Sequence, residues 1–201
     1  MTRIISIEGN IGAGKSTIIE HIRQRIGDDV IVVNEPIREW LNCKDNSGCS
    51  KFESFNKCPD LRAFEFQLYV QMTRIVEMSR ILKNIKDDKL IIVERTIESG
   101  NKIFGGELVE RGLLSPAEQR ELVRITSCLK SWEDEYIILI KTEPSICLDR
   151  IRNRARGGEE SVDLKFLERL DRLYNGFGTI EVDGSQSPEM IAELIIEHIR
   201  K

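Results

Sequence analysis

The chain carries, close to its N-terminus, the stretch Gly9-Asn10-Ile11-Gly12-Ala13-Gly14-Lys15-Ser16. It matches the pattern G-x₄-G-K-[ST] and stands between an apolar run and a segment with helical periodicity. In such a loop, backbone N–H groups surround phosphate oxygens, and the N-terminus of the next helix adds its dipole. The lysine reaches the β- and γ-phosphates, and the serine hydroxyl binds Mg²⁺. The stretch therefore predicts a site for a nucleoside triphosphate with Mg²⁺.

Outward from this loop, short β-branched runs alternate with helical patterns. Four near-continuous apolar runs, at 3–8, 30–34, 90–94 and 136–141, are typical of buried parallel strands, and 179–183 is a weaker fifth strand nearer an edge. Helices are expected at 16–26, 61–84, 144–152, 164–174 and 188–200, with another starting at Ser115-Pro116. The alternation predicts one α/β domain over 1–201: a P-loop NTPase-type parallel five-stranded sheet flanked by helices, with an arginine-rich lid at about 150–162.

Composition narrows the class of protein. The net charge is −4, which disfavours nucleic acid as a partner and favours a small substrate. No run approaches the roughly 20 apolar residues of a membrane span. The N-terminus shows no targeting pattern, so we expect a cytoplasmic location. The five cysteines have irregular spacing, which favours free thiols over disulfides or a zinc site.

A P-loop alone does not select among nucleotide-binding enzymes. The base-reading Asn-Lys-x-Asp of small GTPases is absent, and 201 residues are few for a large ATPase, which leaves small-molecule kinases. Glu94 and Arg95 end one predicted strand, where the acid can hold Mg²⁺ and the arginine can neutralise charge on the transferred group. Glu35 ends another, and its carboxylate could take the proton from an attacking hydroxyl. The alternative reading of these residues is ordinary strand ends with surface charges.

Arginines recur near 150–156, before Gly157-Gly158. Arg150 and Arg154 are four residues apart and so share a helix face, with Arg156 just beyond. A cationic, hinged segment suits an enzyme that closes over phosphates and excludes water. A solvated basic turn balanced by Glu159 and Glu160 is the competing interpretation.

Taken in order, these motifs resemble the deoxynucleoside kinase family. The resemblance is carried by GNIGAGKST at 9–17 (ending in Thr17), EPIREW at 35–40, FQLYV at 66–70 with Arg74, ERT at 94–96 and RIRNRARGGEE at 150–160. It implies an enzyme of nucleotide salvage and DNA precursor synthesis that phosphorylates the 5′-hydroxyl of a deoxyribonucleoside, with ATP and Mg²⁺, as a homodimer.

The resemblance also implies roles for individual residues. Glu35 corresponds to the general base, Arg95 to the arginine beside the hydroxyl and phosphates, and Glu94 to the Mg²⁺-linked acid. Gln67 corresponds to the glutamine that pairs with the nucleobase, and Trp40 to a wall of the pocket. The lid matches are Arg150, Arg154, Arg156 and Glu159, the last holding the sugar 3′-hydroxyl, with Glu160 as the alternative register.

The chain departs from the family at several positions. Thr96 replaces a serine, and Asn56, next to Phe55, stands where a tyrosine usually helps to bind the 3′-hydroxyl. Arg74 matches a base-site arginine that is paired with an aspartate in cytidine- and purine-preferring relatives, but that aspartate position is Gly100 here. The base preference therefore stays open, with a slight lean toward pyrimidines.

Two other functions compete. The tail at 182–188 is similar to that of thymidylate kinases, which would make the acceptor a monophosphate. Against this, a neutral hydroxyl needs a base such as Glu35 and an ionised phosphate does not. The other alternative is a non-catalytic ATP-binding regulatory protein. Against it stands an intact catalytic set, namely Lys15, Ser16, Glu35, Glu94 and Arg95.

Overall fold

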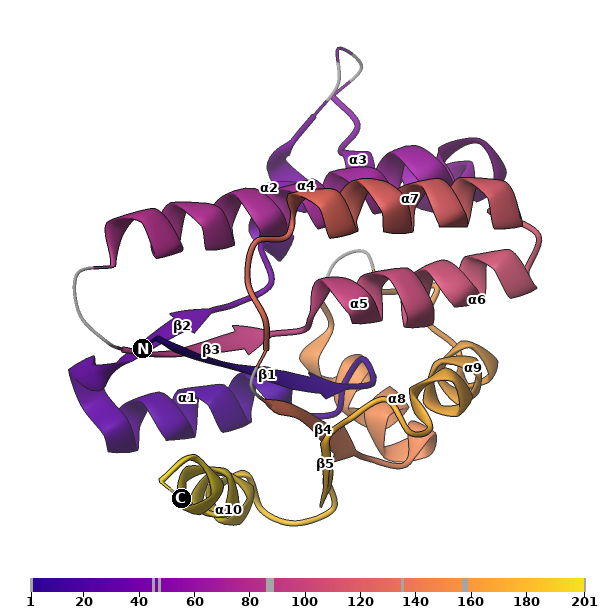
Figure 1. Ribbon diagram of the computed structural model, residues 1–201. Coiled ribbons are helices and arrows are strands. Elements are labelled where there is room, and N and C mark those ends of the chain that lie inside the picture. Colours follow the sequence, from indigo (N-terminus) through magenta and orange to yellow (C-terminus); the bar gives the residue numbers. More distant parts are fainter. Residues whose placement is uncertain are drawn as a thin grey trace.

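The structure is a computed structural model that describes residues 2–44, 46, 48–85, 89–134, 136–156 and 159–200. Five parallel strands form one sheet in the order β2-β3-β1-β4-β5 (Figure 1). The strands are β1 (Arg3–Gly9), β2 (Val30–Val33), β3 (Leu90–Glu94), β4 (Tyr136–Lys141) and β5 (Ile180–Asp183). The predicted α/β architecture is confirmed, and β5 lies at an edge as its weaker pattern indicated.

Helices cover both faces of the sheet (Figure 1). The chain order is α1 (Lys15–Ile26), α2 (Ile37–Asn42), α3 (Lys51–Lys57), α4 (Pro59–Asn84), α5 (Ile97–Ser99), α6 (Gly105–Glu110), α7 (Pro116–Leu129), α8 (Pro144–Arg154), α9 (Leu164–Tyr174) and α10 (Pro188–Ile199). A 3₁₀ turn, Gly27–Asp29, leads into β2, and a π-helical turn, Gly100–Phe104, joins α5 to α6.

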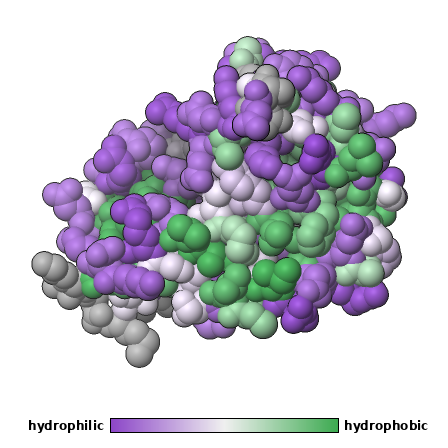
Figure 2. All heavy atoms as spheres, turned by 90° about the horizontal axis from the view of Figure 1, so that it is seen from above, coloured by the Kyte–Doolittle hydropathy of each residue, from purple (hydrophilic) through white to green (hydrophobic). Residues whose placement is uncertain are grey.

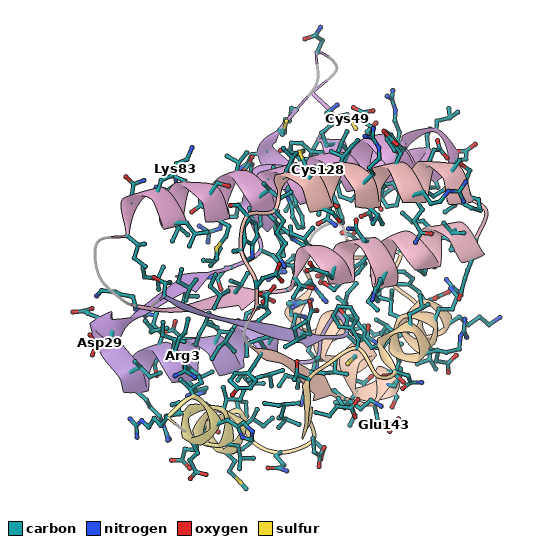
Figure 3. All side chains as sticks on the ribbon, in the orientation of Figure 1. Arg3, Asp29, Cys49, Lys83, Cys128 and Glu143 are labelled. Carbon is teal, nitrogen blue, oxygen red and sulfur yellow. The ribbon has the colours of Figure 1, made fainter. Side chains whose placement is uncertain are left out.

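Two apolar layers hold the sheet in place. On one face, isoleucines of β1 and β4 pack with α1, α8 and α10 in the largest core cluster. On the other face, Ile4 and Ile91 pack under Met78 of α4. Side chains fill the space between the sheet and these helices in Figure 3. The sequences of the buried strands are nearly continuous apolar runs because both faces of the sheet are covered.

Local signals explain most helix boundaries. Ser115 caps α7 in a capping box with Glu118, and Pro116 occupies the first turn, as the sequence predicted. The long helix α4 begins at Pro59, two residues earlier than expected, because that proline also suits a first turn. The short helices α2 and α3 and the helical stretch from α5 to α6 were not predicted.

Candidate active site

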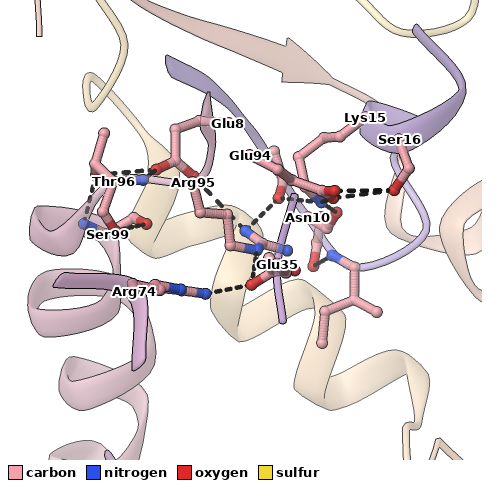
Figure 4. A network of polar contacts seen from close by, with 12 residues as sticks. Glu8, Asn10, Lys15, Ser16, Glu35, Arg74, Glu94, Arg95, Thr96 and Ser99 are labelled. Atoms are coloured by element: carbon pink, nitrogen blue, oxygen red, sulfur yellow. Dashed lines mark hydrogen bonds and ion pairs between the residues drawn. The ribbon is translucent and has the colours of Figure 1, made fainter. Parts of the chain in front are cut away.

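The strand order explains why distant motifs meet. β3 lies between β2 and β1 and all three are parallel, so their carboxyl ends share one edge of the sheet. The P-loop follows β1, Glu35 follows β2, and Glu94 ends β3. Figure 4 shows these residues gathered in one polar network, which joins three strand ends at the crevice where α/β sheets bind ligands.

The P-loop is folded around the ammonium group of Lys15. Its Nζ donates hydrogen bonds to the carbonyl oxygens of Gly9, at 3.3 Å, and Asn10, at 3.0 Å. Gly12 and Gly14 both have left-handed backbones, and a Cβ on Gly12 would overlap the carbonyl oxygen of Cys147 in α8. Gly12 is therefore required by shape as well as by conformation, and Gly14 by its conformation. Ile11 precedes Gly12 in the loop, and Ala13 lies between Gly12 and Gly14.

Burial affects the charge of Lys15. Burial, with a smaller contribution from the positive charge of Arg95, lowers the pKa of the Lys15 ammonium to about 8. The nearby carboxylate of Glu94, 3.9 Å away, acts in the opposite direction. At neutral pH the group is mostly protonated, so it can bind a polyphosphate.

Ser16 and Glu94 place three oxygen atoms together. The Ser16 hydroxyl lies 3.1 Å from each carboxylate oxygen of Glu94. Thr17, next in α1, is exposed. Hydroxyl and carboxylate oxygens are the hard ligands that Mg²⁺ takes from proteins, so this pair fits the chemistry of that ion. Among the described residues, no group of three or more His, Cys, Asp or Glu side chains is arranged to hold a metal ion.

Glu35 lies between two arginines. One of its carboxylate oxygens is 3.2 Å from Nε of Arg95 and also forms an ion pair with Nη2 of Arg74 (Figure 4). Burial would raise the pKa of the Glu35 carboxyl, but the positive charges of Arg95 and Arg74 outweigh it and lower that pKa to about 2. Glu35 is therefore ionised throughout the physiological pH range.

Arg95 is held rigidly from several directions. Its backbone is left-handed, with φ at 70°, a conformation that a side chain makes costly and that functional sites often contain. Its Nη1 donates to the Gly9 carbonyl, at 2.8 Å, and to the Tyr174 hydroxyl, and lies 3.6 Å from Glu8. Burial raises the pKa of Tyr174 well above its ordinary value, so the neutral phenol donates to Glu8 at 3.1 Å.

Sequence reasoning missed Glu8 and Tyr174. Glu8 is fully buried, and it also accepts hydrogen bonds from the backbone N–H of Thr96, at 2.6 Å, and from its hydroxyl, at 3.0 Å. A carboxylate inside an otherwise apolar strand was the available signal, since a buried charge needs partners. Tyr174 gave no comparable signal, because it occupies an ordinary apolar position of α9.

Residues of α2 and α4 form the other side of the site. Trp40 is buried against Phe66 and Val70, and its indole N–H donates to the Thr73 hydroxyl at 2.9 Å. The Arg74 guanidinium lies over the Trp40 ring, 5.5 Å from its centre. Gln67 is 7% exposed, one turn before Gln71 on the same helix. Trp40 thus belongs to the core and also borders the arginine at the site.

The structure does not place Asn56 in the interior. Asn56 is exposed on α3, whereas its neighbour Phe55 turns inward and stacks on Phe66, with 4.8 Å between ring centres. An apolar ring in a hydrophobic cluster stabilises more than a polar amide would, which explains which of the two residues faces inward.

The arginine cluster divides into two parts. Arg150 donates to the Ala13 carbonyl of the P-loop, at 3.2 Å, and to the carbonyl of Gly184, just after β5, at 3.4 Å. Arg154 instead donates twice to Glu159, at 3.1 and 2.7 Å, and Arg156 is 3.8 Å from the same carboxylate.

Helix α8 runs two residues beyond the predicted end, to Arg154. Ala155 then has a left-handed backbone that ends the helix, so Arg156 lies outside it. The glycine hinge predicted at 157–158 is outside the described residues. Glu160, the alternative to Glu159, is exposed.

Two further predictions concern the state of the cysteines and the presence of membrane-spanning segments. Cys43, Cys49, Cys58, Cys128 and Cys147 are all free thiols. Burial raises the pKa of the Cys147 thiol to about 11. Within the described ranges, no helix combines the length and the apolar composition that crossing a membrane requires.

Comparisons with known proteins identify the family of the chain. The model of the deoxynucleoside kinase family matches residues 5–191. Chicken deoxycytidine kinase 2 is 30% identical over 192 residues, which cover 84% of this chain and 71% of the relative. Human deoxycytidine kinase is 29% identical over 198 residues, covering 84% and 73%. The thymidine kinase of Ictalurid herpesvirus 1 is 30% identical over 206 residues, covering 96% and 84%. The chain therefore belongs to the deoxynucleoside kinase family, whose members are ATP-dependent phosphotransferases acting on deoxynucleosides.

Proposed function

We propose that this protein transfers the γ-phosphate of ATP to the 5′-hydroxyl of a pyrimidine deoxyribonucleoside, as a step in nucleotide salvage and DNA precursor synthesis. The observation that carries the proposal is the meeting of three strand ends, which brings the P-loop within one polar network of Glu35, Glu94 and Arg95. A phosphate donor and a hydroxyl acceptor can be held in line at such a point, and phosphoryl transfer depends mainly on positioning and electrostatics.

The phosphate side of the site is formed by the loop and the start of α1. Backbone N–H groups from Gly9 to Thr17 and the ammonium of Lys15 bind the phosphates, and Arg150, directed at the loop, adds charge. Ser16 and Glu94 would hold Mg²⁺, which neutralises phosphate charge when bound. Arg154 and Arg156 of the lid segment (150–162) complete the cationic wall.

The acceptor side depends on Glu35 and Arg95. Glu35 is always ionised at neutral pH, so it can accept the proton of the 5′-hydroxyl. Its low pKa makes it a weak base while both arginines hold it, and its basicity rises if Arg74 turns away to a substrate. Arg95, fixed by Glu8 and the Gly9 carbonyl, stays to neutralise charge on the transferred group.

Recognition of the nucleoside uses residues farther from the loop. We assign Gln67 and Arg74 to the nucleobase edge, and Trp40 to the wall of the pocket. Glu159 is assigned to the 3′-hydroxyl of the sugar. Asn56 is also assigned to the sugar, which requires α3 to turn on binding so that this exposed side chain faces the pocket. Deoxycytidine and thymidine appear in the names of the relatives described above, and they support a pyrimidine substrate.

We further propose that residues 1–201 form one domain that acts as a cytoplasmic homodimer. Free thiols are typical of a reducing compartment. Figure 2 shows apolar side chains gathered on the face where α4 and α7 lie. The exposed apolar side chains of these two helices are Leu61, Val76, Val123 and Leu129. A second copy would cover them, and Val76→Lys with Leu129→Lys should give a monomer in analytical ultracentrifugation.

A substrate panel tests the main proposal. Purified protein with ATP and Mg²⁺ is assayed on thymidine, deoxycytidine, deoxyadenosine and deoxyguanosine, and on their monophosphates. We expect phosphorylation of at least one pyrimidine nucleoside. Activity on dTMP alone would instead identify a thymidylate kinase, and ATP binding without turnover of any acceptor would identify a regulatory protein.

A further inference from the structure

A chain of buried hydrogen bonds runs from α7 to α4 and ends beside the active site. The Thr126 hydroxyl donates to the Leu122 carbonyl at 2.8 Å, and its oxygen accepts a bond from Nδ2 of Asn101 at 2.9 Å. The Oδ1 of Asn101 accepts from Nε2 of Gln71 at 3.1 Å. The same Nε2 donates to the Ile97 carbonyl at 2.8 Å, just after β3.

The direction of this chain fixes the orientation of Gln71. Thr126 has only one proton, and a backbone carbonyl takes it, so the hydroxyl must accept from Asn101. Asn101 then offers only its oxygen to Gln71, which must present its NH₂ group and uses both hydrogens. The amide oxygen Oε1 of Gln71 takes no part in this chain of hydrogen bonds. It is buried and has no hydrogen-bond partner among the described residues, and Gln71 as a whole is 1% exposed.

Neighbouring groups on α4 show what Gln71 faces. Gln67 and Arg74 lie four residues before and three after it, so the three side chains share one helix face. Nη2 of Arg74 pairs with Glu35, whereas its Nε and Nη1 are buried without partners in the described part of the chain. This face therefore carries one open acceptor, on Gln71, and two open donors, on the Arg74 side chain that also reaches Glu35.

Gly100 makes room for this arrangement. A Cβ on Gly100 would overlap Nε2, Cδ and Oε1 of Gln71, so only glycine permits the amide to lie there. Gly100 stands at the position of the aspartate found in cytidine- and purine-preferring relatives. The space that a side chain would take there is filled by the Gln71 amide, whose oxygen is an acceptor without negative charge.

We propose that Gln71 is a specificity-determining residue whose Oε1 accepts a hydrogen bond from an N–H group on the edge of the nucleobase, next to an acceptor atom that Arg74 binds. The inference rests on the proposed function. A base that places an acceptor or a methyl group against Oε1 leaves it unpaired, and sites built to bind a polar group reject such analogues strongly. The N–H can come from the 4-amino group of cytosine or from ring N3 of thymine.

Two pairs of substrates distinguish these sources. Deoxycytidine is compared with the deoxyriboside of pyrimidin-2-one, which lacks the 4-amino group, and thymidine with N3-methylthymidine. Each pair is assayed with the unaltered protein and with Gln71→Ala, whose smaller side chain leaves room for the methyl group. For the natural nucleoside that supplies the N–H, we expect kcat/KM of the unaltered protein to exceed the kcat/KM for its analogue roughly ten-fold or more. Gln71→Ala should reduce that preference to about two-fold or less, with the KM for ATP unchanged.

Gln119→Ala is the matched control. The Gln119 amide donates to the backbone carbonyl of Asn101 at 3.1 Å, so its loss disturbs the same neighbour without touching the α4 face. This variant should keep the full preference. If Gln71→Ala does not fold, Gln71→Ala/Gly100→Ala replaces it, because the methyl group at position 100 refills part of the space.

The outcomes separate the two proposals. A protein that phosphorylates nucleosides but shows the same preferences with and without the Gln71 side chain overturns this inference alone. Loss of preference in Gln119→Ala as well would make Gln71 a structural residue, which also overturns it. Failure of the unaltered protein to phosphorylate any nucleoside overturns the proposed function and this inference with it.

Discussion

The two sides of the active site satisfy their polar groups in different ways. On the phosphate side, Lys15 is held by carbonyl oxygens of its own loop, and Ser16 is paired with Glu94. On the nucleoside side, Gln71 and Arg74 keep three buried polar atoms that no described residue satisfies. In the proposed function, the phosphate side binds a group common to all nucleoside triphosphates. We therefore expect selectivity to come from the nucleoside side, whose hydrogen bonds are left for a substrate to complete.

The largest effect should come from the phosphate side. Lys15→Met removes the only ammonium group inside the described part of the loop, and we expect kcat to fall by roughly 10²–10³-fold, the scale of losing one preorganised charge in a buried site. Lys130→Met is the control, because Lys130 is similarly buried and paired with Glu98 and Asp134. Steady-state kinetics at saturating ATP measures both, and equal losses would remove the special role of Lys15.

Glu35→Gln should act on chemistry and not on the donor. We expect kcat to fall about 10²-fold or more, because the amide cannot accept the hydroxyl proton, with little change in ATP affinity. Glu107→Gln is a suitable comparison: that carboxylate is 2% exposed and lies 3.0 Å from Arg169 and 3.7 Å from Arg111, away from the site. Near-normal turnover in Glu35→Gln would exclude it as the base.

Gln67→Ala should separate the two sides most clearly. The variant leaves donor and acceptor groups of the nucleobase unpaired, so we expect the nucleoside KM to rise about ten-fold while the ATP KM stays constant. Both constants come from one set of initial rates. A parallel loss at both sides would indicate misfolding or a wrong assignment, and Gln119→Ala again serves as the control.

The smallest effect is the dependence of ATP binding on pH. Lys15 has a pKa of about 8 in the protein, and the negative phosphates should raise it, so the complex binds more protons than the free protein above pH 8. We expect ATP affinity to weaken about two-fold between pH 8 and 8.5, with uptake of a fraction of a proton. Calorimetry in two buffers of different ionisation enthalpy measures the uptake. Its persistence in Lys15→Met would assign the proton to another group.

The sequence predicted the parts that depend on contiguous patterns. The P-loop, the five strands and the strand-end residues Glu35, Glu94 and Arg95 follow from local motifs and from the rule that parallel strands share a carboxyl edge. The structure also brings them together, although the role of each stays a prediction.

Features that depend on distant contacts could not be predicted. Glu8 and Tyr174 are 166 residues apart, and no local pattern joins them. The helical stretch from Ile97 to Glu110 contains Gly100, Gly105 and Gly106, which have low helix propensity, so packing must stabilise it. Gly100 is tolerated there because Gln71 of α4 fills the adjoining space.

The close approach of Gly12 to Cys147 has a mechanical consequence. The backbone of α8 touches the P-loop with no room for a methyl group at Gly12, and Arg150 of α8 adds a hydrogen bond to the loop at Ala13. We therefore expect the first turns of α8 to move together with the P-loop and with the phosphates that the proposed function places there. In the proposed function the arginine segment opens and closes, and we expect it to pivot beyond Arg154, at the left-handed Ala155. Substitutions that stiffen this joint should then slow product release before they alter catalysis.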